Sequence, residues 1–268
     1  MEQEIIEIEG GTGCAIPATE MCAFLAEYSS RLFCSGSTCI RLEKNVSRIA
    51  EAYGMTVEIT ILPRHIHLTV RDCDYHEVVT TIVSIGDGPI SFDLNTRLSK
   101  LSWQIADGKI GFGQARQVFH RLVGEKRKQV FNLPFIVSCA NASFCRLFEG
   151  DWVAMAVVFV ATFVGYVLKE TLSEKGVDFR LTVIICAFVS TVLAAGDGLF
   201  GLGTTPGVAV ATSVLYLVPG IPFINSFSDM LDRHYICAFG RLMNAIVLTF
   251  CISAGLGIGM FMMGISMF

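Results

Sequence analysis

Charged residues are scarce in this chain, and they are unevenly spread. They make up 16% of the 268 residues, against 53% hydrophobic residues, and the mean hydropathy is +0.59. Residues 1–130 carry 14 Lys or Arg and 16 Asp or Glu, whereas residues 131–268 carry only 6 and 8. This asymmetry predicts a water-soluble first half and a membrane-embedded second half.

Three further absences exclude classes of protein. The net charge is −2 in each half, so the chain has no basic surface for nucleic acid. The first ten residues, MEQEIIEIEG, lack the basic-then-apolar layout of a signal peptide, so we expect the soluble half to stay in the cytoplasm. The ten cysteines are scattered and several lie in apolar stretches, which predicts small buried hydrophobic side chains rather than a disulfide framework.

The first half predicts a small α+β domain over residues 17–128, after a flexible lead over residues 1–16. Apolar residues recur at helical spacing before Gly54 and after Ser91, and alternate with polar residues in between. The order ααβββαα favours an antiparallel sheet covered by helices. The elements are expected at about residues 17–33, 38–53, 56–61, 66–70, 78–85, 91–107 and 115–122.

Metal and catalytic motifs are weak in this half. His65 and His67 share one face of a predicted strand, with Cys73 and His76 just beyond, and these residue types could ligate zinc. No pair of close-spaced ligand motifs frames them, so a polar sheet face is the preferred interpretation, with no metal and no cofactor. Gly111-Phe112-Gly113 lacks the strand and spacing of a dinucleotide fingerprint. Without a nucleophile–base pair either, the chain is not expected to be an enzyme.

The second half, residues 129–268, predicts a membrane domain of about five spans. The basic run at residues 126–128 precedes the first apolar segment and marks the cytoplasmic side. An acidic turn at residues 149–151 and a Gly-rich loop at residues 196–207 are expected outside, and a charged loop at residues 169–180 inside. The spans are expected at about residues 131–148, which include Asn141, and at 152–168, 181–195, 208–224 and 242–262.

The fourth apolar segment is interrupted at Pro219-Gly220-Ile221-Pro222. Each proline lacks a backbone donor and clashes with the carbonyl four residues earlier, so a continuous helix is not expected. In lipid, each freed backbone group costs several kcal/mol unless protein or water satisfies it. The interruption is therefore either a packing device or a binding site.

A helix that restarts with Pro222 in its first turn would carry a polar stripe of Asn225, Ser226, Asp229 and Arg233. Its N-terminal end would suit a carboxylate, and Asp229 could hold an ammonium group, relay a proton or pair with Arg233. Alternatively, the break only bends the chain toward a cytoplasmic loop, and residues 229–233 are an ordinary solvated surface. Two further candidates begin the fifth span, Arg241 and Asn244, although the positive-inside pattern alone explains Arg241.

The layout resembles the threonine/serine exporter family. The specific part is LVPGIPFINSFSDM in the fourth segment, followed by Arg241 and the run SAGLG at residues 253–257. The resemblance extends over the chain from Pro17 onward, and it carries over Pro219, Gly220, Asn225 and Asp229. The substrate-path candidates are Pro219, Gly220, Pro222, Asn225, Ser226, Asp229, Arg233, Arg241 and Asn244.

The resemblance implies a secondary exporter of small carboxylates, driven by protons, in the bacterial cytoplasmic (inner) membrane. Long members of the family carry a second membrane half, whereas this chain is similar to the larger subunit of the split, two-component form. A smaller membrane subunit, a hetero-oligomeric assembly and a substrate such as threonine, serine or succinate are therefore expected. The rival hypothesis is a membrane-anchored ligand sensor or regulatory protein, in which the spans only anchor the soluble domain.

Overall fold

The computed structural model describes residues 16–72, 77–86, 88, 90–125, 132–201 and 203–265, without the side chains of residues 197, 199 and 200. Its contacts divide the chain into two units. The first unit is Met1–Lys126 with Asn225–Gly240, and the second is Arg127–Ile224 with Arg241–Phe268. The segment 225–240 therefore groups with residues 1–126, although the sequence alone assigned it to the membrane domain.

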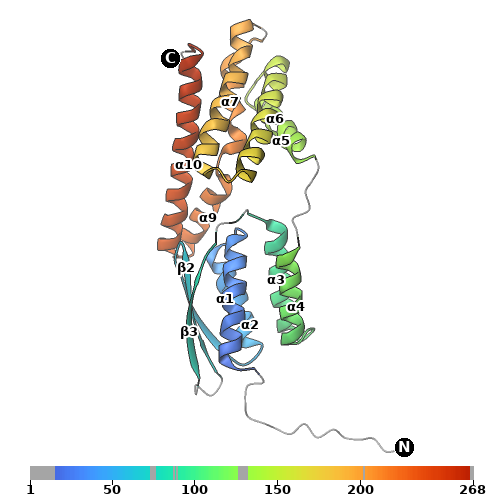
Figure 1. Cartoon of the computed structure of the whole chain (residues 1–268), viewed down its shortest axis with the longest axis vertical. Coiled ribbons are helices and arrows are strands. Elements are labelled where there is room, and N and C mark those ends of the chain that lie inside the picture. Colours follow the sequence, from blue (N-terminus) through green and yellow to red (C-terminus); the bar gives the residue numbers. More distant parts are fainter. Residues whose placement is uncertain are drawn as a thin grey trace, which may run out of the picture. The chain divides into compact units, whose positions relative to one another are not determined.

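The first unit contains the predicted ααβββαα order. A three-stranded antiparallel sheet with strand order β1-β2-β3 forms one layer, α1 and α2 the next, and α3 with α4 the outermost (Figure 1). The elements are α1 Ala18–Cys34, α2 Cys39–Glu51, β1 Thr56–Ile61, β2 His65–Arg71, β3 Val78–Ser84, α3 Phe92–Ala106 and α4 Phe112–Gly124.

The core of this unit follows from the helical and the strand spacing of its apolar residues. On β2 the side chains of Ile66, Leu68 and Val70 are fully buried, while His65 and His67 point to the opposite, more exposed face. Tyr28 in α1 is also fully buried, and its hydroxyl donates to the carbonyl oxygen of Leu98 in α3 over 2.9 Å. Burial raises the pKa of Tyr28, so this hydroxyl stays neutral and keeps donating.

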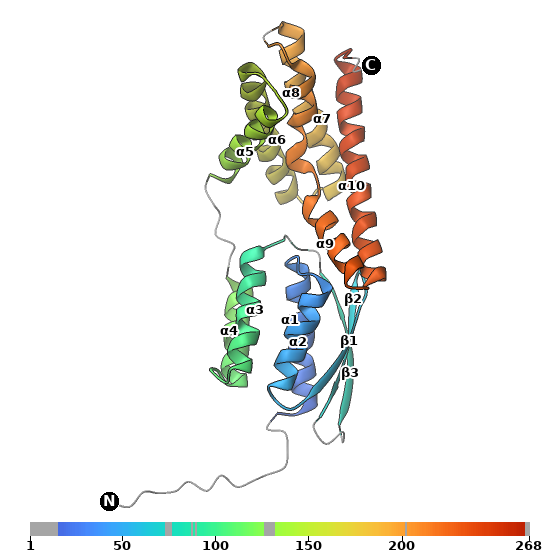
Figure 2. The ribbon, with the colours of Figure 1, turned by 180° about the vertical axis from the view of Figure 1, so that it is seen from behind.

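The second unit is built of apolar helices. Figure 2 shows α6 between α5 and α7, with α8 packed against all three. Both α9 and α10 contribute residues to both units. The elements are α5 Leu133–Leu147, α6 Trp152–Glu174, α7 Phe179–Phe200, α8 Pro206–Ser213, the 3-10 helix η1 Leu215–Leu217, α9 Gly220–Leu231 and α10 Tyr235–Met262.

Several helix ends differ from the predicted span ends. Helix α6 continues into the charged segment expected as a loop, because its Lys and Glu residues are good helix formers, and it ends where Gly176 adopts a φ of 72°. Helix α7 continues through Gly196, where the Gly-rich loop was expected to begin, and ends at Phe200 before Gly201 with a φ of 60°. A single glycine inside a helix costs only about 1 kcal/mol and does not end it.

Three of the helices described are long and apolar enough to cross a membrane, namely α6, α7 and α10. The count rises to four if the helices at Pro206–Leu217 and Gly220–Leu231 form one bent span. Helix α5 has 15 residues and is about 22 Å long, shorter than the roughly 30 Å of a bilayer core. The five-span count and the cytoplasmic location therefore stay predictions.

Candidate functional site

The break in the fourth apolar segment lies between η1 and α9. Val218, the residue before Pro219, has a φ of −59° and a ψ of 127°, the extended conformation that a following proline imposes. Helix α9 then begins at Gly220, with Pro222 in its first turn, where a missing N–H costs no helical hydrogen bond. The helices on the two sides of the break are bent by 62° relative to each other.

Side chains satisfy the backbone next to this break. Asn141 in α5 is 4% exposed, and its Nδ2 donates to the Thr162 hydroxyl over 2.6 Å and to the Thr212 carbonyl oxygen over 3.1 Å. Thr212 lies at the end of α8, where the regular helical hydrogen bonds stop. Asn141 thus supplies the donor that an interrupted helix needs in an apolar environment. The sequence shows Asn141 within an apolar segment, but no sequence pattern identifies its hydrogen-bond partners.

Helix α9 presents a polar face made by Asn225, Ser226 and Asp229, called the α9 polar face below. The Nδ2 of Asn225 donates to the carbonyl oxygen of Gly36 over 3.0 Å. The hydroxyl of Ser226 donates to the carbonyl oxygen of Ala238 in α10 over 2.7 Å. All of these residues belong to the first unit. Two side chains of the face therefore bind backbone groups of other elements of that unit.

Asp229 is the centre of this face. Its carboxylate is fully buried, and Oδ1 accepts a hydrogen bond of 2.8 Å from the backbone N–H of Cys39. Cys39 is the first residue of α2, and the side chain of Thr38, the residue at the N-cap, makes no capping hydrogen bond. Asp229 therefore caps α2 from a distant part of the chain, where the helix dipole also favours a negative charge.

Arg233 lies outside the α9 polar face, contrary to the sequence prediction. Helix α9 ends at Leu231, and Arg233 follows in the left-handed region with a φ of 67°. Its N–H bonds to the Met230 carbonyl and that of His234 to the Asp229 carbonyl, the hydrogen-bond pattern of a Schellman C-cap. Arg233 is exposed in this turn, because the helical spacing stops two residues earlier.

The remaining candidates belong to the second unit. Pro219 is buried, Pro222 is partly exposed and Gly220 is exposed. On α10, Arg241 is partly buried and Asn244 is exposed. The structure thus separates the nine candidates into the α9 polar face, the α9–α10 turn, the residues at the break and the two residues of α10.

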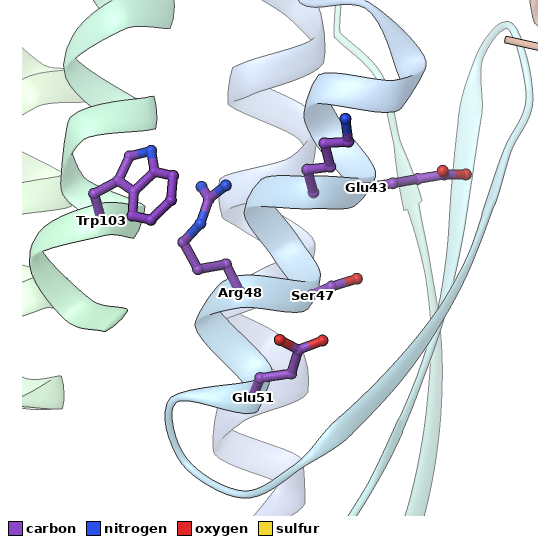
Figure 3. A pocket seen from close by; sticks show the side chains of 6 residues that line it. Glu43, Ser47, Arg48, Glu51 and Trp103 are labelled. Atoms are coloured by element: carbon purple, nitrogen blue, oxygen red, sulfur yellow. The ribbon is translucent and has the colours of Figure 1, made fainter. Parts of the chain in front are cut away.

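The first unit also has an open depression of about 550 Å³ between α2 and α3 (Figure 3). The Arg48 guanidinium lies 3.7 Å from the centre of the Trp103 ring and donates to Asn45 and Ser102, each over 2.8 Å. Arg48 therefore joins α2 to α3. The residues that line the depression include charges of both signs, as expected for a solvated surface: Glu43, Lys44, Ser47, Arg48, Glu51 and Trp103.

The histidines of the sheet do not form a metal cluster with any other described residue. His65 is exposed and His67 is partly exposed on the outer face of β2. Cys73 and His76, the other two residues considered as ligands, lie outside the described residues. Among the described residues, the group of side chains placed to share a metal ion is Cys39, Asp229 and Cys237.

The long apolar helices indicate a membrane protein, and the family match adds that it is of the transporter class. The chain belongs to the threonine/serine exporter family (ThrE), whose pattern matches residues 23–263. This membership is consistent with the expectation that the chain is not an enzyme.

Curated relatives fall into two size classes. The chain is 28% identical to the "Probable succinate transporter subunit YjjP" of Klebsiella aerogenes, over 92% of this chain and 94% of that one. It is 30% identical to the Escherichia coli K12 protein of the same name, over 45% of this chain and 47% of that one. It is 24% identical to the "Probable threonine/serine exporter" of Mycobacterium tuberculosis, over 83% of this chain but 42% of that one. No solved structure matches the chain.

Proposed function

We propose that this chain is the larger subunit of a two-component secondary exporter for small carboxylates. The substrate is threonine or serine, or a C4-dicarboxylate such as succinate, and a proton gradient drives its export. The observation that carries the proposal is the helix interruption at Pro219, from which α9 restarts with its N-terminal end at the break. Such half-helix ends accept anionic substrate groups in transporters.

The relatives support the split arrangement. The Klebsiella protein, named as a subunit, is matched over nearly its whole length, whereas the mycobacterial exporter has more than half of its length unmatched. A smaller membrane protein would supply the corresponding second half. The assembly would lie in the inner membrane of a bacterium, with five spans from this chain and with residues 17–128 in the cytoplasm.

The contacts of the first unit suggest separate roles for seven of the nine candidates. Asn225 and Asp229 bind backbone groups near the start of α2, so we assign them to the coupling between the soluble unit and α9. The better candidates for direct contact with the substrate are the three residues at the break and two residues of α10, namely Pro219, Gly220, Pro222, Arg241 and Asn244.

Efflux from preloaded membrane vesicles tests this function. Vesicles containing the chain and its smaller subunit should release at least one of labelled succinate, threonine and serine, and release should fall to background when the proton gradient is dissipated. Vesicles with either subunit alone are the matched control and should release none. Ligand binding to the chain without transport of any of the three by the pair would instead support a membrane-anchored sensor.

A further inference from the structure

Two thiols and one carboxylate converge in the first unit. The ligand atoms of Cys39, Asp229 and Cys237 all lie within 4.8 Å of one another. The three side chains are 0%, 0% and 1% exposed. They come from α2, α9 and α10, so they do not form a close-spaced sequence motif. We propose that these three residues form a binding site for a thiophilic divalent cation, with Zn²⁺ as the preferred ion.

The separations suit tetrahedral zinc. With Zn–S bonds of about 2.3 Å and Zn–O bonds of about 2.1 Å, neighbouring ligand atoms lie roughly 3.5 to 3.8 Å apart. Ligand atoms within 4.8 Å of one another would have to approach by no more than about 1.3 Å, which we ascribe to χ rotation of the three side chains. Two thiolates with one carboxylate select Zn²⁺, Co²⁺ or Cd²⁺ over Mg²⁺ and Ca²⁺, which prefer sites made entirely of oxygen ligands.

Hydrogen bonds around the cluster hold its ligands in place. The backbone N–H of Cys39 donates to Oδ1 of Asp229 over 2.8 Å and so fixes the plane of the carboxylate. The Ser226 hydroxyl donates to the carbonyl oxygen of Ala238 over 2.7 Å and holds α9 against the turn of α10 that carries Cys237. Such outer hydrogen bonds are typical of metal sites, where they orient the ligating groups.

The ligands also set the proton balance of the site. Zn²⁺ binds thiolates, so its binding would release the thiol protons of Cys39 and Cys237 and should weaken as the pH falls. Three protein ligands leave the fourth tetrahedral position for water or for an exogenous carboxylate. The bound ion would join the starts of α2 and α10 to α9, and this role does not depend on the proposed transport.

Cobalt binding to the purified full-length chain tests the site. After treatment with a chelator, Co²⁺ should produce thiolate-to-metal charge-transfer bands and the visible bands of tetrahedral cobalt, saturating at about one ion per chain, and Zn²⁺ should displace it. Cys39→Ser and Cys237→Ser should each remove the charge-transfer bands or weaken binding at least tenfold. Asp229→Asn should weaken it by roughly tenfold or more.

The matched control is Cys22→Ser, which removes a buried thiol of the same unit whose Sγ points to the carbonyl oxygen of Val79 instead. Binding by this variant should equal that of the unaltered chain. A readout without substitutions is alkylation followed by mass spectrometry in mild denaturant, which lets the reagent reach buried thiols. Zn²⁺ should slow the alkylation of Cys39 and Cys237 but not that of Cys139, which is exposed.

Three results would overturn the proposal. The first is the absence of saturable charge-transfer bands in the unaltered chain. The second is an equal rate of alkylation of Cys39 and Cys237 with and without Zn²⁺ in the mild denaturant. The third is unchanged cobalt binding in the Cys39→Ser/Cys237→Ser double variant, which would place the ion elsewhere.

Discussion

Asp229→Ala is expected to open the first turn of α2. The substitution removes the acceptor of the Cys39 N–H and leaves that donor without its 2.8 Å hydrogen bond in a fully buried place. A hydrogen bond to a charged group contributes about 1.5–3 kcal/mol, so the local opening free energy should fall by about that amount. Hydrogen exchange of the amides at the start of α2 should accelerate by roughly 10-fold or more.

Two variants separate the causes of this effect. Asp229→Asn keeps an oxygen acceptor but loses the charge at the helix N-terminus, so its exchange should be accelerated less. Asp232→Ala is the matched control, because Asp232 also carries a carboxylate at the end of α9 but is exposed. If Asp229→Ala and Asp232→Ala left the α2 amides equally protected, the capping role of Asp229 would be wrong.

Gly255→Ala is expected to disrupt the packing of α10 against α7. A Cβ atom at Gly255 would collide with the carbonyl oxygen of Ile184 and lie 2.8 Å from the Ala187 Cβ. Both obstacles belong to the rigid body of α7, so the helices would have to separate. Overpacking of this kind costs roughly 1–3 kcal/mol, and the apparent melting temperature of the purified protein should fall accordingly.

The control lies on the same helix two residues further on. A Cβ at Gly257 would meet no described atom within 4 Å, so Gly257→Ala should leave the melting temperature unchanged or raise it slightly. Gly259→Ala should resemble Gly255→Ala, because its Cβ would lie 2.8 Å from the Thr191 side chain. Equal melting temperatures for Gly255→Ala and Gly257→Ala would contradict this packing.

The regular elements of the first unit were predictable from periodicity. Alternation of Ile66, Leu68 and Val70 with polar residues predicted β2, and the structure buries all three. Helix ends in the second unit were less predictable, because hydropathy marks where an apolar segment stops and α6 continues beyond that point through helix-forming charged residues.

The partners of the polar residues could not be predicted from the sequence. Asp229 and Cys39 are 190 positions apart, and no local pattern signals that one caps the helix of the other. The placement of Arg233 was wrong for a related reason. Its spacing from Asp229 fits a continuing helix, but the C-cap ends α9 first, and a non-glycine residue at positive φ has no sequence signature.

The interruption at Pro219 is the central feature of this account, and the efflux of the Pro219→Ala variant tests it most directly. Alanine restores a donor and a helical conformation at this position, so the chain could continue from η1 into α9 without the break. Pro206→Ala is the control, because Pro206 is the first residue of α8, where proline is replaceable. Vesicles containing the smaller subunit and Pro219→Ala are expected to lose proton-driven efflux, while those with Pro206→Ala keep it. Efflux by Pro219→Ala at the rate of the unaltered chain would contradict it.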